Sequence, residues 1–137
     1  MFPPPTPWKA VGDVDPDHEY LGFTSRFFLA SMRSVPGFLA QSQRIKKQAN
    51  AAPGVVGWSL AADLLKLEFY TLSAWESGSQ LRAFVAQAHH NDAMAKFAGS
   101  MRQESIFVYF PLLGRELPLK WKDAVALQNA RRSPRTD

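Results

Sequence analysis

The stretch "FYTLSAWESGSQLRAFVAQAHHNDAM", residues 69–94, decides the fold because it joins a strand, a turn and a helix. The alternating pattern of residues 67–75 predicts a strand. Ser77 and Gln80 stand three residues apart, a spacing typical of a capping box at the start of a helix, and Ser79 is a rival cap. Apolar side chains then recur at helical spacing, at Leu81, Phe84, Val85 and Ala88.

Aromatic residues on both faces of this strand are candidates for a binding pocket. Trp75 shares a face with Phe69 and Ser73, and we interpret it either as a core aromatic or as one wall of a pocket. Tyr70 lies on the opposite face. Tyr70, and Tyr109 from a later strand, could present hydroxyls to a cavity or could bond a structural partner, as buried tyrosines usually do.

The helix of this stretch stops at two adjacent histidines, His89 and His90. On a continuous helix His89 lies at the edge of the apolar stripe and His90 points toward solvent, so His89 is the better candidate for a general base or a haem ligand. A structural explanation is also open, because an imidazolium is favoured at a helix C-terminus. The apolar spacing beyond the histidines predicts a break there, with Asn91 capping a second short helix.

Further elements are predicted on both sides of this stretch. They are a strand over residues 18–29, a helix that begins at Pro36 and ends within residues 50–54, a strand over residues 55–61, a last strand over residues 104–113 and a short helix after Trp121. The main order is strand, helix, strand, strand, helix, strand, which is the split βαβ arrangement of ferredoxin-like folds. We therefore predict an α+β domain with an antiparallel sheet.

Both faces of the last predicted strand, "ESIFVYFPLL" at residues 104–113, carry apolar or aromatic side chains. A sheet with one face in water would carry polar side chains on that face. We therefore expect both faces of the sheet to be covered. Few helices remain to cover the second face, so another subunit is its simplest cover, and the sequence predicts a homodimer.

The chain divides into three expected segments. Residues 1–17 hold five of the ten prolines and predict an extended arm. Trp8 either pins this arm to the body or to a partner subunit, or the arm is a loosely ordered leader. Residues 18–128 form the ferredoxin-like domain and residues 129–137 a basic tail. The arm has no basic region followed by an apolar stretch, so we expect a cytoplasmic protein rather than a secreted one.

Composition excludes several kinds of site. The 137 residues include no cysteine, which excludes disulfides, thiolate metal sites and cysteine nucleophiles. No apolar run is long enough to span a bilayer, and no membrane partner is expected. The net charge of +4 comes largely from "RIKK" at residues 44–47 and "RRSPR" at residues 131–135, and neither belongs to a recognisable nucleic-acid-binding module. Glycine-rich phosphate loops and convincing metal-ligand spacings are absent from the sequence.

Arg26 is a charged residue in the middle of the first predicted strand. A charge at such a position must reach water or a partner. A salt bridge or a dimer contact is one explanation. The alternative is a functional one, in which the guanidinium binds a substrate carboxylate or a haem propionate.

The element order, "TLSAWES" followed by "LRAFVAQAHHNDAM", and the late "FVYF" strand resemble the antibiotic-biosynthesis-monooxygenase-like proteins of the dimeric α/β-barrel superfamily. The resemblance covers roughly residues 18–125 and looks closest to the branch of unknown function called DUF3291. It implies that two subunits place their sheets together as a barrel, with a pocket between each sheet and its helices. Members of the superfamily include cofactor-independent oxygenases of polycyclic aromatic substrates, haem-degrading enzymes and haem proteins.

The haem-degrading members of the superfamily use an Asn on the first strand with a Trp and a His on the second helical segment. The first strand here offers Thr24, Ser25 and Arg26 and has no Asn. Phe84 stands at the position that resembles the helix Trp. Of these three family residues, only the His has a counterpart in this sequence, at His89 or His90.

The residues and the resemblance together predict a dimeric protein that binds a hydrophobic or aromatic small molecule without a tightly bound cofactor. If it is an oxygenase, His89 is the expected base, and Arg26 or a tyrosine steadies an enolate or phenolate. The expected pocket residues are Trp75, Phe84, Tyr70, Tyr109 and His90. Two alternatives are a non-catalytic dimeric binding or structural module and a haem-binding protein.

Overall fold

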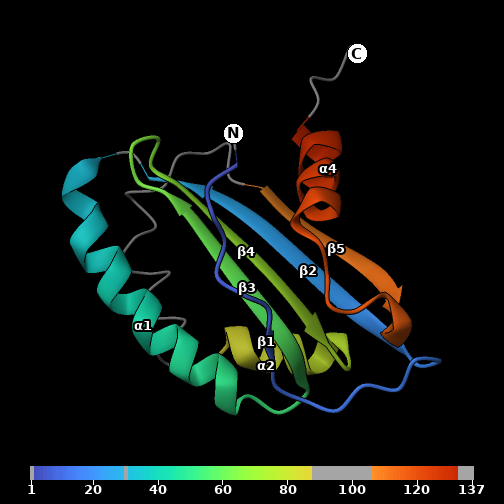
Figure 1. The fold of residues 1–137 in the computed structure, drawn as a ribbon. Coiled ribbons are helices and arrows are strands. Elements are labelled where there is room, and N and C mark those ends of the chain that lie inside the picture. The colour runs from blue at the N-terminus through green and yellow to red at the C-terminus, as the bar shows by residue number, and fades with distance from the viewer. Residues whose placement is uncertain (1, 30, 88–105, 133–137) are drawn as a thin grey trace.

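The computed structural model describes residues 2–29, 31–87 and 106–132, in which one sheet is flanked by helices (Figure 1). The strands are β1 (Lys9–Ala10), β2 (Glu19–Phe28), β3 (Val55–Asp63), β4 (Glu68–Trp75) and β5 (Ile106–Leu113). The helices are α1 (Val35–Ala51), α2 (Gly78–Val85) and α4 (Trp121–Arg132), with short 3-10 turns at Met32–Ser34 and Gly114–Glu116. Every strand pair is antiparallel and the strand order is β1-β3-β4-β2-β5. The predicted ferredoxin-like order is confirmed.

Local sequence signals set the ends of the helices. Ser77 caps α2, because its hydroxyl oxygen accepts a hydrogen bond from the Gln80 amide at 3.3 Å. The other half of the capping box differs from the expected one, since the Ser77 hydroxyl donates to Gln80 Oε1 instead of Gln80 bonding the Ser77 amide. Pro36 stands in the first turn of α1, and the helix ends before Pro53 at the extended residue Ala52.

Strand β2 is central to the sheet, with β4 on one side and β5 on the other. Side chains alternate along it, so it defines two faces. We call one the helix face; from β2 it carries Leu21, Phe23, Ser25 and Phe27, which lie toward α1 and α2. We call the other the arm face; from β2 it carries Tyr20, Gly22, Thr24, Arg26 and Phe28.

Helices α1 and α2 cover the helix face. The ring of Phe38 on α1 lies 4.5 Å from that of Phe69 on β4, measured between centroids. The ring of Phe84 on α2 lies 5.1 Å from that of Trp75 at the end of β4. Trp75 and Phe84 are both buried in one core cluster. In this structure they are core residues, as one of the two interpretations of Trp75 proposed.

Helix α4 and the N-terminal arm cover the arm face (Figure 1). Gln128 of α4 is fully buried, and its Nε2 donates to Thr24 Oγ1 at 2.8 Å and to the Ser25 carbonyl at 3.3 Å. Trp121 at the start of α4 donates its indole N–H to Ser59 Oγ at 2.9 Å. The second face of the sheet is therefore covered, as expected. On the arm face this cover comes from the chain's own segments and not from a second subunit, while the homodimer itself stays a prediction.

The proline-rich arm is held along β3. The Thr6 amide donates to the Leu60 carbonyl at 2.8 Å, and the Leu60 amide donates to Thr6 Oγ1 at 3.0 Å. The Trp8 ring lies so close to Gly57 that a Cβ there would meet ring atoms at 2.5 Å, which explains a glycine inside this strand. Of the expected roles of Trp8, the pin to the body of the domain is confirmed.

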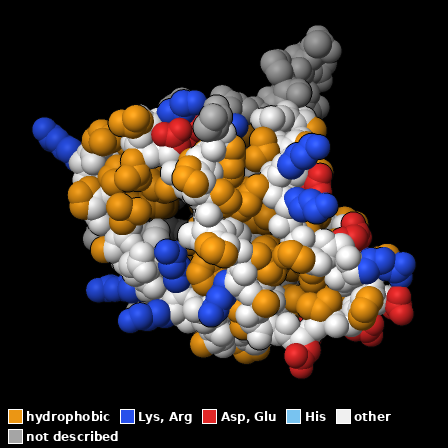
Figure 2. All heavy atoms as spheres, viewed as in Figure 1, with side chains coloured by type: hydrophobic (Ala, Val, Ile, Leu, Met, Phe, Trp, Pro, Cys, Tyr) orange, Lys and Arg blue, Asp and Glu red, His pale blue; other side chains and the backbone are white. Residues whose placement is uncertain are grey.

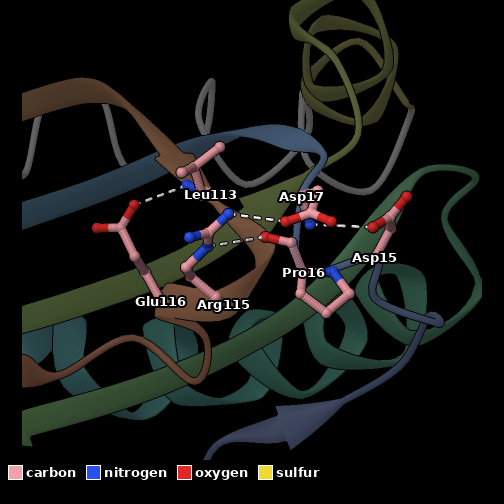
Figure 3. A network of polar contacts seen from close by, with 6 residues as sticks. All are labelled: Asp15, Pro16, Asp17, Leu113, Arg115 and Glu116. Atoms are coloured by element: carbon pink, nitrogen blue, oxygen red, sulfur yellow. Dashed lines mark hydrogen bonds and ion pairs between the residues drawn. The ribbon is translucent and has the colours of Figure 1, made fainter.

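A network of polar contacts joins the end of the arm to the turn after β5 (Figure 3). Arg115 donates to Asp17 Oδ1 at 2.7 Å and to the Pro16 carbonyl at 3.4 Å, while Glu116 accepts from the Leu113 amide at 2.7 Å. The Arg115–Asp17 pair is exposed, so it contributes little to stability and serves mainly to fix the geometry of the two loops.

The C-terminal helix is longer than the sequence indicated. Helix α4 begins at Trp121, as predicted, but continues to Arg132. It therefore crosses the expected boundary between residues 128 and 129. The buried position of Gln128 makes this helix part of the domain.

We predict that Gln128→Ala lowers the free energy of unfolding by about 2–4 kcal/mol, because it leaves a cavity and removes both hydrogen bonds of the side chain. Gln128→Met should cost much less, because it nearly preserves volume and removes an Oε1 atom that has no partner among the described residues. Urea denaturation measures both. Equal stability of wild type and Gln128→Ala would contradict the packing of α4 described above.

Candidate functional site

Three residues form a polar cluster on the arm face, at the end of β2 and the start of β4. Arg26 Nη2 lies 3.0 Å from Glu68 Oε1, and each of the two side chains is 14% exposed. The Tyr70 hydroxyl donates to the other carboxylate oxygen, Glu68 Oε2, at 2.5 Å. The Glu68 carboxylate thus accepts hydrogen bonds from one charged donor, the Arg26 guanidinium, and one neutral donor, the Tyr70 hydroxyl. We call Arg26, Glu68 and Tyr70 the ion-pair cluster.

Aromatic rings enclose the ion-pair cluster. The Arg26 guanidinium carbon lies 5.1 Å from the centroid of the Phe28 ring and 5.2 Å from that of Tyr70. Phe2 of the arm and Trp121 of α4 lie against Tyr70, at centroid distances of 4.8 and 6.4 Å. With Glu68 as its partner and rings around it, Arg26 has the structural role that one of its two interpretations proposed.

The ion-pair cluster has a clear electrostatic consequence at Tyr70. Burial, and the hydrogen bond that its hydroxyl donates to Glu68, raise the pKa of Tyr70 from 10.0 to about 12. Arg26 acts in the opposite direction, and its effect is smaller. Tyr70 therefore stays protonated at neutral pH, as a donor already engaged by Glu68.

The helix face carries a different set of polar groups. Strand register places Thr71 of β4 opposite Ser25 of β2, and Ser73 of β4 opposite Phe23. The hydroxyls of Ser25 and Thr71 are hydrogen-bonded to each other, and Ser73 Oγ accepts from the Trp75 indole at 2.9 Å. We call Ser25, Thr71 and Ser73 the hydroxyl row. A hydroxyl has one proton to donate and two lone pairs, so these bonds leave capacity for a ligand.

Aromatic side chains border the hydroxyl row toward β5. Phe107 stands opposite Ser25, and Tyr109 stands opposite Phe23. The ring of Phe23 lies 5.0 Å from that of Tyr109 and 6.4 Å from that of Phe107. Phe107 is 39% exposed and Tyr109 61% exposed, although both are large apolar or aromatic side chains. This part of the helix face combines aromatic surface with nearby hydroxyls, which suits a planar ligand with a polar substituent.

The structure separates the residues that the sequence grouped into one pocket. Arg26 and Tyr70 lie on the arm face, whereas Trp75, Phe84 and Tyr109 belong to the helix face. The two predicted histidine positions, His89 and His90, lie outside the described residues, and so does Asn91. A single pocket containing both Arg26 and Trp75 is therefore wrong, because the sheet lies between them.

The sequence interpretation gave no site role to Glu68, to the hydroxyl row or to Phe23 and Phe107, and it gave no role to the buried Gln128. Glu68 lies inside the strand predicted over residues 67–75 but was given no role there; it alternates onto the face of Tyr70 and lies opposite Phe28. Gln128 was the last residue assigned to the domain, although it is fully buried. The signal for Glu68 was available, because a mid-strand arginine calls for an acid on a neighbouring strand.

Two kinds of site can be assessed for the part of the chain that the structure describes. Within residues 2–29, 31–87 and 106–132, no group of three or more His, Asp or Glu side chains could hold a metal ion. Within the same residues no helix has the length and apolar character needed to cross a bilayer.

Comparison with known proteins gives a fold match. No protein-family model and no curated protein matches the sequence. Among solved structures, an antibiotic biosynthesis monooxygenase has a TM-score of 0.59 and 15% identity, over 66% of this chain and 95% of that chain. SnoaB, a cofactor-independent oxygenase from Streptomyces nogalater solved as a mutant, has a TM-score of 0.56 and 17% identity, over 72% and 97%. A dimeric ferredoxin-like protein of unknown function from Thermobifida fusca has a TM-score of 0.58 and 17% identity, over 73% and 97%.

The chain has the ferredoxin-like fold of the antibiotic biosynthesis monooxygenases. At these identities the similarity shows the fold alone. The first neighbour is matched over 95% of its length but this chain over only 66%, so this chain carries segments that the neighbour lacks. The arm and α4 stand outside the split βαβ core, and both lie on the arm face.

We predict that Tyr70→Phe lowers the free energy of unfolding by about 1–3 kcal/mol at neutral pH, because Glu68 loses a hydrogen-bond donor. The raised pKa means that the Tyr70 contribution is fully present below pH 10 and is lost as pH rises from 10 to about 12. The difference between wild type and variant should therefore shrink over that range. Urea denaturation at a series of pH values measures it.

Tyr109→Phe is the matched control, since Tyr109 is 61% exposed and the substitution should change stability little. A gap between wild type and Tyr70→Phe that stays constant up to pH 12 would contradict the assignment.

Proposed function

We propose that the protein binds a hydrophobic or aromatic small molecule on the helix face, against Phe23, Phe107 and Tyr109. The observation that carries the proposal is the hydroxyl row beside exposed aromatic rings. A sheet face that served only as a core would favour apolar side chains at Ser25 and Thr71, since a buried polar group has to be compensated by a hydrogen bond. The fold match supports the same face, since the resemblance implies a pocket between sheet and helices.

The chemistry of the face favours a planar molecule that carries a hydroxyl or carbonyl group. Rings stack on or meet the edges of Phe23 and Tyr109, and each such pair adds about 0.5–1.5 kcal/mol to apolar burial. Thr71, which is half-buried, is the member of the hydroxyl row best placed to bond the polar substituent. On the opposite face, the Tyr70 hydroxyl and Arg26 Nη2 are already bonded to Glu68.

We predict that naphthol binds the protein and that Tyr109→Ala weakens the affinity roughly three- to tenfold, through the loss of one aromatic contact. Thr71→Val, which keeps the shape of the side chain, should weaken naphthol but not naphthalene, because naphthalene has no hydroxyl to bond. Isothermal titration calorimetry measures both. Tyr70→Phe, on the other face, is the control and should leave the affinity unchanged. An equal loss in Tyr70→Phe, or none in Tyr109→Ala, would refute the site.

The reaction class that we propose for the bound molecule is cofactor-independent oxygenation of a ring CH2 group. A base removes a proton, the carbanion forms a C–O bond with O2, and the hydroperoxide loses water to leave a carbonyl. One oxygen atom enters the product and the other leaves as water, so the CH2 carbon supplies all four electrons. SnoaB supports this choice, as a fold neighbour described as a cofactor-independent oxygenase.

The base in this proposal is His89, which lies outside the described residues. With anthrone as the substrate, we expect oxygen uptake in a ratio of one O2 to one substrate, above the uncatalysed rate. His89→Ala should lower the rate by about 10²–10⁴-fold while naphthol still binds, since proton transfer contributes that much. An oxygen electrode measures the rate. If His89→Ala leaves uptake unchanged, the base is wrong, whereas the binding proposal is judged by the calorimetry alone.

Two other expectations from the sequence stay predictions. Haem binding depends on His89 and His90. It would replace the oxygenase proposal if added haem gave a Soret absorption band that is lost when both histidines are substituted together. The homodimer is supported by the dimeric neighbour from Thermobifida fusca. Because the arm and α4 already cover the arm face, we propose that such a dimer uses another surface. Membership of the DUF3291 branch and a cytoplasmic location likewise remain part of the proposal.

A further inference from the structure

The turn between β3 and β4 exposes two leucines. Leu64 is 43% exposed and Leu65 93% exposed, in a turn that spans residues 64–67. Turns favour Gly, Pro, Asn, Asp and Ser, so two leucines at the tip are not explained by turn geometry. Leu65 contributes almost nothing to the core of the domain. Its side chain is available to an apolar environment outside the chain.

Two further exposed apolar side chains, Met32 and Leu39, lie at the start of α1. This end of α1 is packed next to the same turn. The Leu29 amide donates to the Leu67 carbonyl at 3.0 Å, and Val35 shares a core cluster with Leu67. Figure 1 shows the turn protruding at the end of the sheet beside the first turns of α1. The four apolar side chains therefore belong to the same end of the molecule.

Two exposed cations, Arg33 and Lys66, border this end, with Asp63 beside Lys66, and further cations follow in the second half of α1. No Asp or Glu occurs between Glu19 and Asp63, whereas Arg33, Arg44, Lys46 and Lys47 fall in that interval. Lys66 lies in the turn itself, beside Asp63. Arg33, Arg44, Lys47 and Lys66 are exposed. We call Met32, Arg33, Leu39, Leu64, Leu65 and Lys66 the corner surface. Figure 2 shows hydrophobic side chains gathered where α1 meets the turn, with basic side chains along α1.

We propose that the corner surface docks the protein on an anionic lipid surface, with Leu64 and Leu65 entering the interfacial layer. A lipid interface presents negative headgroups directly above an apolar layer, which matches leucines bordered by Arg33 and Lys66. A nucleic acid would satisfy the cations but leave the leucines in water. A protruding turn also suits a soft interface, which needs no shaped pocket. This peripheral contact requires no membrane-spanning helix, and it departs from the expectation that the protein has no membrane partner.

The test is flotation of the full chain with vesicles of phosphatidylcholine, alone or with about one third phosphatidylserine. Wild type should float with the anionic vesicles and not with the neutral ones, and added salt should release it. Leu64→Ser with Leu65→Ser should weaken partitioning roughly tenfold or more, because both apolar side chains are lost. Arg33→Gln with Lys66→Gln should weaken it by roughly fivefold for each charge removed.

The matched control is Lys120→Gln with Lys122→Gln, which removes the same charge from exposed positions at the start of α4. It should float like wild type. Circular dichroism should show all variants folded, since the substituted side chains are exposed. Failure of wild type to float with anionic vesicles, binding of polyuridylate instead, an equal loss in the control, or full flotation of the leucine variant would each overturn the proposal.

Discussion

The structure depends on one constraint: strand β2 is hydrogen-bonded on both edges and covered on both faces. Its partners β4 and β5 satisfy the backbone, so the remaining requirement is a cover for each row of alternating side chains. Helices α1 and α2 cover one row, while α4 and the arm cover the other. The fully buried Thr24 and Gln128 show how closely the second cover is fitted, because a polar pair can be buried there only with its hydrogen bond formed.

The two faces consequently have different chemistry. On the arm face Arg26 Nη2 and the Tyr70 hydroxyl both bond Glu68, although Arg26 Nε and Gln128 Oε1 have no partner among the described residues. The resulting pKa of Tyr70, about 12, keeps that hydroxyl a donor to the carboxylate. On the helix face the hydroxyl row is satisfied with capacity to spare, beside rings that remain partly in water. This contrast, more than any single residue, is why we place ligand binding on the helix face and a structural role on the arm face.

The periodicity of the sequence was sufficient to predict the core of the fold. The two faces of residues 18–29, the Ser77 cap and the strand ending at Trp75 all follow from local patterns, because alternation and capping are decided by near neighbours. The contacts of the arm and α4 could not be predicted this way. Gln128 and Thr24 are 104 residues apart in the sequence, and their hydrogen bond produces no periodic pattern in either segment that sequence analysis could detect. The grouping of Arg26 and Trp75 in one pocket has the same cause. The two residues lie on different strands, and only the strand register shows that their side chains lie on opposite sides of the sheet.

The central claim is that a small aromatic molecule binds to the helix face and not to the arm face. A crystal structure of the protein with naphthol tests it most directly. The account predicts the naphthol ring against Phe23 and Tyr109, with its hydroxyl within hydrogen-bond distance of Thr71, and an unchanged ion pair between Arg26 and Glu68. A naphthol molecule lodged beneath α4 against Tyr70, with Phe2 displaced, would contradict it.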